Sequence, residues 1–544
     1  MPAVEVVLGL LVAVAVLALV ARRLHVPYPI VLVIGGLALG LVPGLPAVRL
    51  APEVVFLVFL PPLVYAAGWF TSVRDFKANL RPVGLLSIGL VVATVVGIAV
   101  VAHTLVPSLP WAAAFALGAI VSPTDAVAAS AIFARLGAPR RIVAILEGES
   151  LVNDATGLIA YRYAVVAVVA GGFSLWEAGM QFVLSGIGGV AIGLALAWLL
   201  GQLQRRLEDP VIEITLSFLV PYGIYLAAEQ AHVSGVLAVA VAGIYAGWRS
   251  PETFSATTRV QALAVWGTML FVLNGLVFVL IGLQLPGILS GLAGWSPAQL
   301  VAYAAVISLA VIVIRFLWVF PATYLPRFLS GRLRRRDPYP GWRNVVVVSW
   351  TGMRGVVSLA AALSLPLTVA GGGPFPGRDL ILFLTFSVIL ATLVVQGLSL
   401  PPLMRWLGVG DDGEAARQEE AGARVQAIEA ALGRLDELAL QEWTRDDGVD
   451  YMRYYYGKRR RVVDAQFGRV DHEHPEDGHQ HEPGRDHAEQ HRERLDGMNR
   501  LKQEMLSAER AMVIRLRNQG TIGDEVMHRI ERDLDLEEVR LASS

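Results

Sequence analysis

Apolar runs long enough to cross a lipid bilayer recur along the first 410 residues of this 544-residue chain. A helix needs roughly 20 residues to span ~30 Å of hydrocarbon, and thirteen runs come near or exceed this length. In chain order they cover residues 4–20, 27–43, 52–70, 83–105, 111–133, 143–170, 178–202, 211–230, 234–248, 262–286, 298–322, 343–369 and 379–403. The pattern predicts an all-α membrane domain over residues 1–410 with about 13 transmembrane helices, followed by a tail over residues 411–544.

The charges divide at the same boundary. Residues 1–410 carry 24 basic and 15 acidic side chains, whereas residues 411–544 carry 21 basic and 31 acidic ones. Soluble domains are about one-quarter charged, so only the tail has the composition of a soluble domain. This distribution excludes a collagenous, wholly disordered or nucleic-acid-coating protein. The chain has no cysteine, which excludes disulfide scaffolds, thiolate metal sites and cysteine nucleophiles.

The basic residues predict the orientation in the membrane. If the N-terminus lies outside, 19 of the 24 basic residues in the first 410 fall in cytoplasmic loops, and only Arg49 and Arg378 fall in outer loops. Cytoplasmic loops normally carry this excess. The first run has no basic residue before it, and Arg22 and Arg23 follow it, which indicates a retained span and not a cleaved signal. We therefore expect a multi-pass cell-membrane protein with a cytoplasmic tail.

The sixth run carries most of the charge inside a span. It contains Glu149, Ser150, Asn153 and Asp154, and the pairs four residues apart form two adjacent polar rows on a helix. A charge at mid-membrane costs about 2.5–3.5 kcal/mol, so such groups normally face a cavity or a partner. Carboxylate, amide and hydroxyl oxygens are hard ligands. The cluster therefore indicates a site for Na⁺, Li⁺ or H⁺, and its structural alternative is a hydrogen-bonded contact between helices.

Two other runs are predicted to contain helix breaks. In the fifth run Pro123 lies between Ser122 and Thr124-Asp125, and in the twelfth Gly352 and Gly355 flank Arg354. Transporters place ion sites at interrupted helices, because the break frees backbone polar groups. Asp125 is a second candidate ligand, or else a helix cap.

Arginines also occur inside the predicted spans. Arg315 lies in a fully apolar stretch and should have an acidic partner in another span. A purely structural ion pair is the alternative role for both Arg315 and Arg354. Arg162, eight residues after Asp154, is expected to extend toward the membrane surface.

The segment Glu149-Ser150-Leu151-Val152-Asn153-Asp154-Ala155 resembles the Asn-Asp signature of the monovalent cation:proton antiporter family, in its sodium/proton exchanger branch. Four further segments resemble motifs of this family and occur in the family order. They are Phe59-Leu60-Pro61-Pro62-Leu63-Val64-Tyr65, Ser122-Pro123-Thr124-Asp125, Gly352-Met353-Arg354-Gly355 and Val395-Gln396-Gly397-Leu398. The chain is most similar to the bacterial long form with a cytoplasmic tail.

The resemblance implies two inverted repeats, crossed and broken fifth and twelfth helices, and a homodimer without a cofactor. It implies that Asp154 binds either a cation or H⁺, with Ser150, Thr124 and Asp125 completing the site, and that Asn153 makes the exchange electroneutral. It also pairs Glu149 with Arg315. Many members have an acidic residue where this chain has Ala66, so the choice among Na⁺, Li⁺ and K⁺ stays open.

Other functions remain as alternatives to a sodium/proton antiporter. A K⁺/H⁺ antiporter differs only in the ion. A cation channel would use similar carboxylates, and an intramembrane protease could use Asp125 and Asp154 as a pair sharing one proton. The histidine-rich tail adds a divalent-metal exporter to these alternatives.

The tail is predicted to form amphipathic helices over residues 411–470 and 495–540, with apolar residues such as Ile428 and Leu435 at helical spacing. Residues 472–491 contain six of the ten histidines. We expect a solvated linker there, with Zn²⁺ or Ni²⁺ binding or pH sensing as alternatives. The basic run 458–461 is expected to form a solvated helix face; anionic headgroups are nearer partners for it than nucleic acid, which is not an expected partner.

Overall fold

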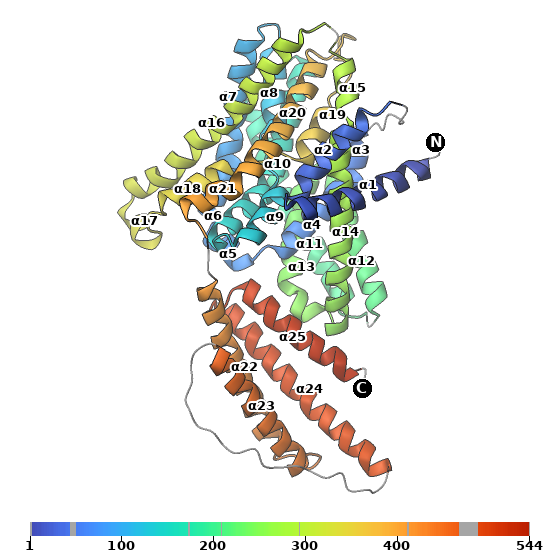
Figure 1. The fold of residues 1–544 in the computed structure, drawn as a ribbon, viewed down its shortest axis with the longest axis vertical. Coiled ribbons are helices and arrows are strands. Elements are labelled where there is room, and N and C mark those ends of the chain that lie inside the picture. Colours follow the sequence, from blue (N-terminus) through green and yellow to red (C-terminus); the bar gives the residue numbers. More distant parts are fainter. Residues whose placement is uncertain are drawn as a thin grey trace. The chain divides into compact units, whose positions relative to one another are not determined.

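The computed structural model describes residues 3–43, 51–171, 175–207, 209–292, 294–410, 413–466 and 488–542. These residues form helices joined by short connections, with no strand among them apart from one isolated bridge between Thr368 and Pro374 (Figure 1). The predicted all-α fold is confirmed. Of the histidine-rich linker predicted at residues 472–491, residues 472–487 lie outside the described residues.

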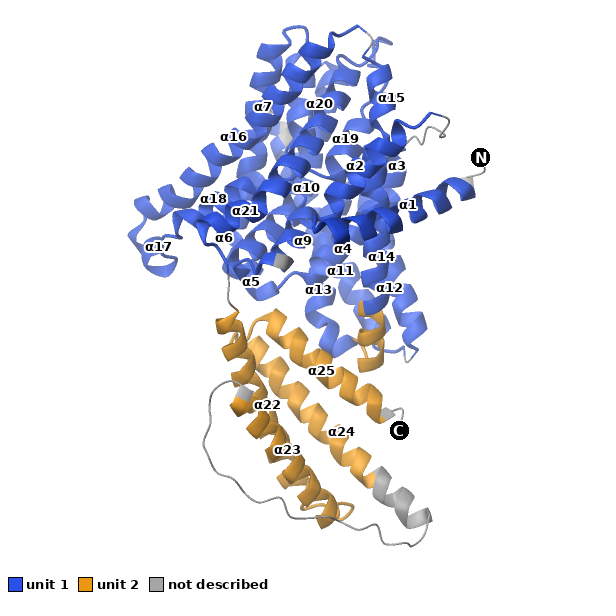
Figure 2. Cartoon of the chain, viewed as in Figure 1, with its two compact units in different colours: residues 1–253, 264–411 blue, residues 254–263, 412–544 orange. Residues whose placement is uncertain are grey.

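The chain divides into two compact units (Figure 2). Unit 1 comprises residues 1–253 and 264–411, and unit 2 comprises residues 254–263 and 412–544. Helix α14 (Ala256–Leu283) begins in unit 2 and continues into unit 1.

Unit 1 is built from α-helices and three π-helical segments. In chain order these are α1 (Ala3–Leu24), α2 (Tyr28–Gly40), α3 (Pro52–Val54), η1 (Val55–Phe59), α4 (Leu60–Phe70), α5 (Val73–Ala78), α6 (Leu80–Gly84), η2 (Leu85–Leu90), α7 (Val91–Leu105), α8 (Trp111–Val121), α9 (Ala126–Leu136), α10 (Arg140–Ala170), α11 (Leu175–Gln204), α12 (Pro210–Gln230), α13 (Gly235–Thr253), most of α14, α15 (Leu285–Ser290), α16 (Pro297–Leu329), α17 (Gly331–Arg336), α18 (Trp342–Trp350), α19 (Val356–Leu363), α20 (Arg378–Ala391), η3 (Thr392–Gln396) and α21 (Gly397–Leu407).

Among the described residues, nine helical segments are long and apolar enough to cross a membrane, and α2 is a shorter apolar helix. The charged α10 is not one of the nine, and α18 and α19 are short because a break separates them. Each predicted apolar run nevertheless overlaps one helix or two or three consecutive helical segments. The number of thirteen spans stays a prediction.

Two helix breaks meet inside unit 1. Helix α8 ends at Val121, and α9 begins at Ala126 after the segment that contains Pro123. The second break separates α18 from α19, and the backbone N–H of Asp125 donates to the carbonyl of Met353 in it, at 2.7 Å. The approach requires glycine at position 355, because a Cβ there would lie 1.9 Å from Oδ2 of Asp125.

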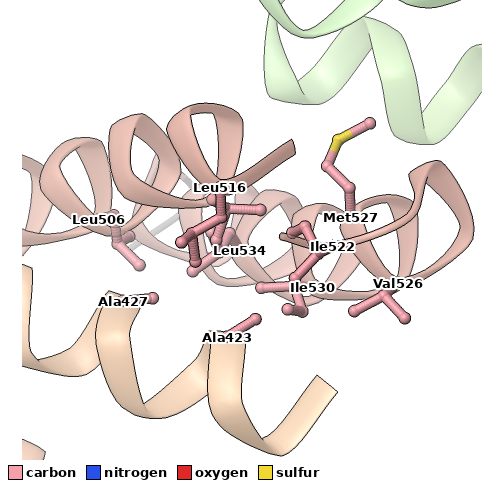
Figure 3. Close-up of a cluster of buried hydrophobic side chains, with 10 residues drawn as sticks. Ala423, Ala427, Leu506, Leu516, Ile522, Val526, Met527, Ile530 and Leu534 are labelled. Carbon is pink, nitrogen blue, oxygen red and sulfur yellow. The ribbon is translucent and has the colours of Figure 1, made fainter. Parts of the chain in front are cut away.

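Unit 2 contains α22 (Glu414–Leu438), α23 (Asp446–Gln466), α24 (Ala488–Asn518) and α25 (Asp524–Ala542). Small residues of α22, Ala423 and Ala427, face larger apolar side chains such as Leu506 of α24 and Ile530 of α25 (Figure 3). A second cluster joins Ile428 and Leu435 to α23 and α24. Apolar residues at helical spacing thus supply the core of the tail.

Candidate functional site

A cavity of about 460 Å³ lies in unit 1 where the two helix breaks meet α10. Its wall includes residues of α2, α4, the α8–α9 break, α10, α14 and the start of α19. The polar side chains in this wall are Tyr28, Thr124, Asp125, Ser130, Glu147, Ser150, Asp154, Asn274 and Ser358. The cavity therefore combines an apolar surround with several convergent oxygens, as small-ligand sites do.

Asp154 presents a carboxylate to this cavity from the middle of α10. Among the described residues, no side chain or backbone group forms a hydrogen bond or ion pair with it. Ser150, one helical turn earlier, accepts a hydrogen bond from the backbone N–H of Ala126 at 3.3 Å. This contact holds α10 against the first turn of α9, so Asp154 lies beside the α8–α9 break.

Asp125 enters the same cavity from the break itself. Its Oδ1 accepts from the backbone N–H of Val127 at 2.8 Å, which makes Asp125 the N-cap of α9. A helix N-terminus has unpaired N–H donors and a partial positive charge, and both stabilise a carboxylate there. The cap therefore fixes the position of Asp125 and leaves its second oxygen at the meeting point of the two breaks.

A buried hydrogen-bond chain runs behind the cavity. Nδ2 of Asn153 donates to Oγ1 of Thr124 at 2.8 Å, and Thr124 in turn donates to Oε1 of Glu149 at 3.0 Å. Oδ1 of Asn153 is buried and has no partner within the described part of the chain. These hydrogen bonds link α10 to the α8–α9 break through side chains alone.

Glu149, the last residue in this series of hydrogen bonds, forms an ion pair with Arg315 of α16. The side chains are 1% and 0% exposed, and both guanidinium Nη atoms contact the carboxylate, Nη2 at 2.8 Å. Nε and Nη2 of Arg315 also donate to the carbonyl of Val348 in α18 at 3.2 and 3.1 Å. The pair therefore ties α10, α16 and α18 together, with both charges satisfied.

Arg354 completes the frame at the second break. Its Nε donates to the carbonyl of Val121, the last residue of α8, at 3.0 Å. Its backbone N–H donates to Oγ1 of Thr392 at 3.1 Å, and its Nη1 contacts the carbonyl of Gly352. The last carbonyls of a helix have no intrahelical donor, so Arg354 satisfies a backbone group that the break in the other helix exposes.

The predicted site residues therefore separate into two groups. Thr124, Asp125, Ser150 and Asp154 line the cavity, whereas Asn153, Glu149, Arg315 and Arg354 lie behind it as a hydrogen-bonded frame. Tyr28 and Asn274 also line the cavity and were not predicted. The sequence could have indicated Asn274, since it is a polar residue within an apolar run. Nothing in the sequence indicated that Tyr28 would line the cavity.

Comparison with known proteins places the chain in a family. The family model described as "Sodium/hydrogen exchanger, transmembrane" matches residues 9–406. The uncharacterized Na⁺/H⁺ exchanger Rv2287 of Mycobacterium tuberculosis is 36% identical over 98% of this chain and 96% of its own length. The sodium, potassium, lithium and rubidium/H⁺ antiporter of Bacillus subtilis is 38% identical over 73% of this chain and 61% of its own length.

A solved structure agrees on the fold. The sodium proton antiporter MjNhaP1 of Methanocaldococcus jannaschii matches with a TM-score of 0.59 at 19% identity, over 76% of this chain and all of that one. With a family model covering most of the membrane half and full-length relatives above 30% identity, the chain belongs to the sodium/hydrogen exchanger family.

Proposed function

We propose that this protein exchanges Na⁺ for H⁺ across the membrane by competition of the two ions for the carboxylate of Asp154. The observation that supports this most directly is the cavity-facing carboxylate of Asp154, which has no partner among the described residues. A carboxylate in a low-dielectric cavity needs a counter-charge or a proton. Na⁺ and H⁺ can each supply it, one at a time.

The neighbouring oxygens suit a small hard cation. Ser150 and Asp125 line the same cavity as Asp154, and Thr124 joins them from the α8–α9 break. Carbonyl, hydroxyl and carboxylate oxygens are the ligands that such cations prefer. Coupling follows if access to Asp154 passes from one side of the membrane to the other only while Asp154 is neutralised by Na⁺ or H⁺.

The ion range and stoichiometry are further parts of the proposal. Ala66 lies in the cavity wall and offers no oxygen there, so the cation has fewer charged ligands on the α4 side. We propose Na⁺ as the principal ion, with Li⁺ and K⁺ as further substrates. Asn153 contributes no charge next to Asp154, which favours electroneutral one-for-one exchange.

The same proposal includes the setting of the protein. Residues 1–410 would form the transport domain of a homodimer in the cell membrane, with the N-terminus outside and residues 411–544 as a cytoplasmic tail. The excess of basic residues in the predicted inner loops supports this orientation.

The test is ion exchange by the purified full-length protein in proteoliposomes that contain a pH-sensitive dye. Wild type should move H⁺ in response to Na⁺, and Asp154→Asn should abolish this response while the protein still inserts. Asp209→Asn is the matched control, because Asp209 is an exposed N-cap of α12 and asparagine also caps helices. Na⁺-dependent H⁺ movement by Asp154→Asn would exclude the proposed site.

Two extensions of this assay address ion choice and stoichiometry. Replacing Na⁺ by Li⁺ or K⁺ across a pH series measures the ion range. Clamping the membrane potential at several values tests electroneutrality, since a rate that follows the potential shows that net charge moves in each cycle.

A further inference from the structure

A second cavity, of about 490 Å³, lies along the C-terminal half of α10. Its wall includes Ala155, Leu158 and Arg162 of α10 and Tyr225 and Glu229 of α12. Asp154 lines the first cavity and Ala155 lines the second. Because adjacent helical residues differ by 1.5 Å in height, the two cavities end at nearly the same level of α10.

The wall of this second cavity joins two groups of helices. Helix α12 packs on α4, α11 and α13, whereas α10 packs mainly on α8 and η2 and makes smaller contacts with α13 and α4. Among the described helices, α10 and α12 share no extensive packing with each other. A change in the distance between these two groups would therefore open or close the second cavity.

One ion pair bridges the two groups at this cavity. Nη2 of Arg162 lies 2.9 and 2.8 Å from Oε1 and Oε2 of Glu229. Oε1 of Glu229 also accepts from the backbone N–H of Gly235 at 3.4 Å, which ties Glu229 to the start of α13. A side-chain hydrogen bond between Tyr161, also in this part of α10, and Ser364 reaches the segment after α19.

We propose that the Arg162–Glu229 ion pair is a breakable latch that holds the second cavity shut at Ala155 while Asp154 faces the first cavity. Ala155 is 2% exposed, so in this structure the second cavity stops just before Asp154. Separation of α10 from α12 would break the pair and extend the second cavity to Asp154. The inference rests on the proposed function, because it supplies the second access route that exchange at Asp154 requires.

The exposure of the pair is consistent with a latch that opens repeatedly. The side chains of Arg162 and Glu229 are 54% and 29% exposed. Solvent-exposed pairs contribute little net stability, so losing this one should shift an equilibrium by up to about fivefold. The buried Glu149–Arg315 pair, by contrast, could not separate in each cycle without a large cost.

The experiment uses the absence of cysteine from the chain. A single cysteine is introduced as Ala155→Cys at the end of the second cavity, and in a second protein as Ala67→Cys in the wall of the first. Each full-length protein is reconstituted and labelled with a small thiol reagent. Arg162→Gln and Glu229→Gln should each accelerate labelling at position 155 by up to about fivefold and slow it at position 67.

Two further variants complete the labelling experiment: one exchanges the two charges of the ion pair, and the other removes an unrelated charge. Arg162→Glu with Glu229→Arg should return both labelling rates toward those of the starting proteins, because the pair is rebuilt. Glu252→Gln, which removes an equally exposed acidic partner of Arg249, should leave them unchanged. Equal labelling at position 155 with and without the pair would overturn the latch.

A crosslink tests the same inference through transport. With Arg162→Cys and Glu229→Cys joined by a short reducible crosslinker, exchange should stop and then return after reduction. Undiminished exchange by the crosslinked protein would contradict the latch. If wild type shows no exchange at all, the proposed function fails, and the labelling rates still decide whether Arg162 and Glu229 control access to position 155.

Discussion

Neutralising Glu149 tests whether the buried ion pair is a structural frame. Glu149 and Arg315 are 1% and 0% exposed, and Glu149 also accepts from Thr124. In Glu149→Gln the amide can still accept hydrogen bonds, but the guanidinium of Arg315 remains buried without a counter-charge. Removing one partner of a buried pair costs about 3–5 kcal/mol in the free energy of unfolding. Arg315→Met, which leaves the carboxylate unpaired, should cost a similar amount.

The double variant separates the charge effect from the loss of contacts. With Glu149→Gln and Arg315→Met together, neither charge of the pair remains to be left without its partner. The principal loss is then at the carbonyl of Val348, which loses its two donors from Arg315. A buried carbonyl without a partner costs about 1–3 kcal/mol. The double variant should therefore be destabilised by several kcal/mol less than the sum of the two single variants.

The four proteins are compared by unfolding in detergent micelles with a rising fraction of sodium dodecyl sulfate, followed by the fluorescence of the chain's 12 tryptophans. Glu252→Gln, which removes one partner of the half-exposed Arg249–Glu252 pair, is the control and should cost at most about 1 kcal/mol. The reasoning is refuted if Glu149→Gln costs no more than this control, or if the two single effects simply add in the double variant.

Three further predictions concern the helix breaks and the tail. Gly355→Ala should abolish exchange without preventing insertion, because its Cβ would displace Asp125, whereas Gly267→Ala, with nothing within 4 Å, should exchange like wild type; normal exchange by Gly355→Ala would show that the close approach is dispensable. Arg259→Gln removes the buried cation that Asp535 and Glu531 share, while Arg510 still contacts Asp535 at 2.8 Å, so hydrogen exchange in α25 of the full-length protein should increase because the free energy of local opening falls by less than the about 3–5 kcal/mol of a fully unpaired buried charge, with the exposed Arg532→Gln as control. Burial raises the pKa of Glu531 above its usual 4.5, so its contribution to stability is present below pH 4.5 and is lost as the pH rises through its folded-state pKa. Hydrogen exchange in α25 should therefore be slower in Glu531→Gln than in wild type, and the difference should grow as the pH rises above 4.5. A difference that is independent of pH would contradict this.

The sequence was sufficient for the all-α fold and for the breaks, because each depends on local chemistry. Pro123 removes a backbone donor and Gly352 and Gly355 weaken a helix, whichever helices surround them. The spacing of Glu149, Ser150, Asn153 and Asp154 likewise fixes their relative positions on α10 without any tertiary information.

Contacts between distant segments could not be read in the same way. Arg162 was expected to extend toward the membrane surface, which stays a prediction, and its pairing with Glu229 of α12 was not predicted. Tyr28 reaches the cavity only because α2 packs near α9 and η3. Residues 254–263 group with the tail; polar residues such as Thr257, Arg259 and Gln261 show that the apolar run has not yet begun there, but they do not show which segment these residues pack against. Each of these contacts depends on which helix faces pack against each other, and helical periodicity does not determine this.

The partners of each charge favour Asp154, and not the more deeply buried Glu149, as the proposed site of ion exchange. Glu149 accepts from Thr124 and from both Nη atoms of Arg315, so a cation would have to displace a guanidinium that is itself buried. Asp154 has no such partner among the described residues, and the ion would be the group that neutralises it. A carboxylate can exchange ions only if nothing in the protein already balances its charge. The Glu149–Arg315 ion pair and the hydrogen bonds of Arg354 to backbone carbonyls hold the helix breaks in place, and Asp154 lies unpaired beside this frame.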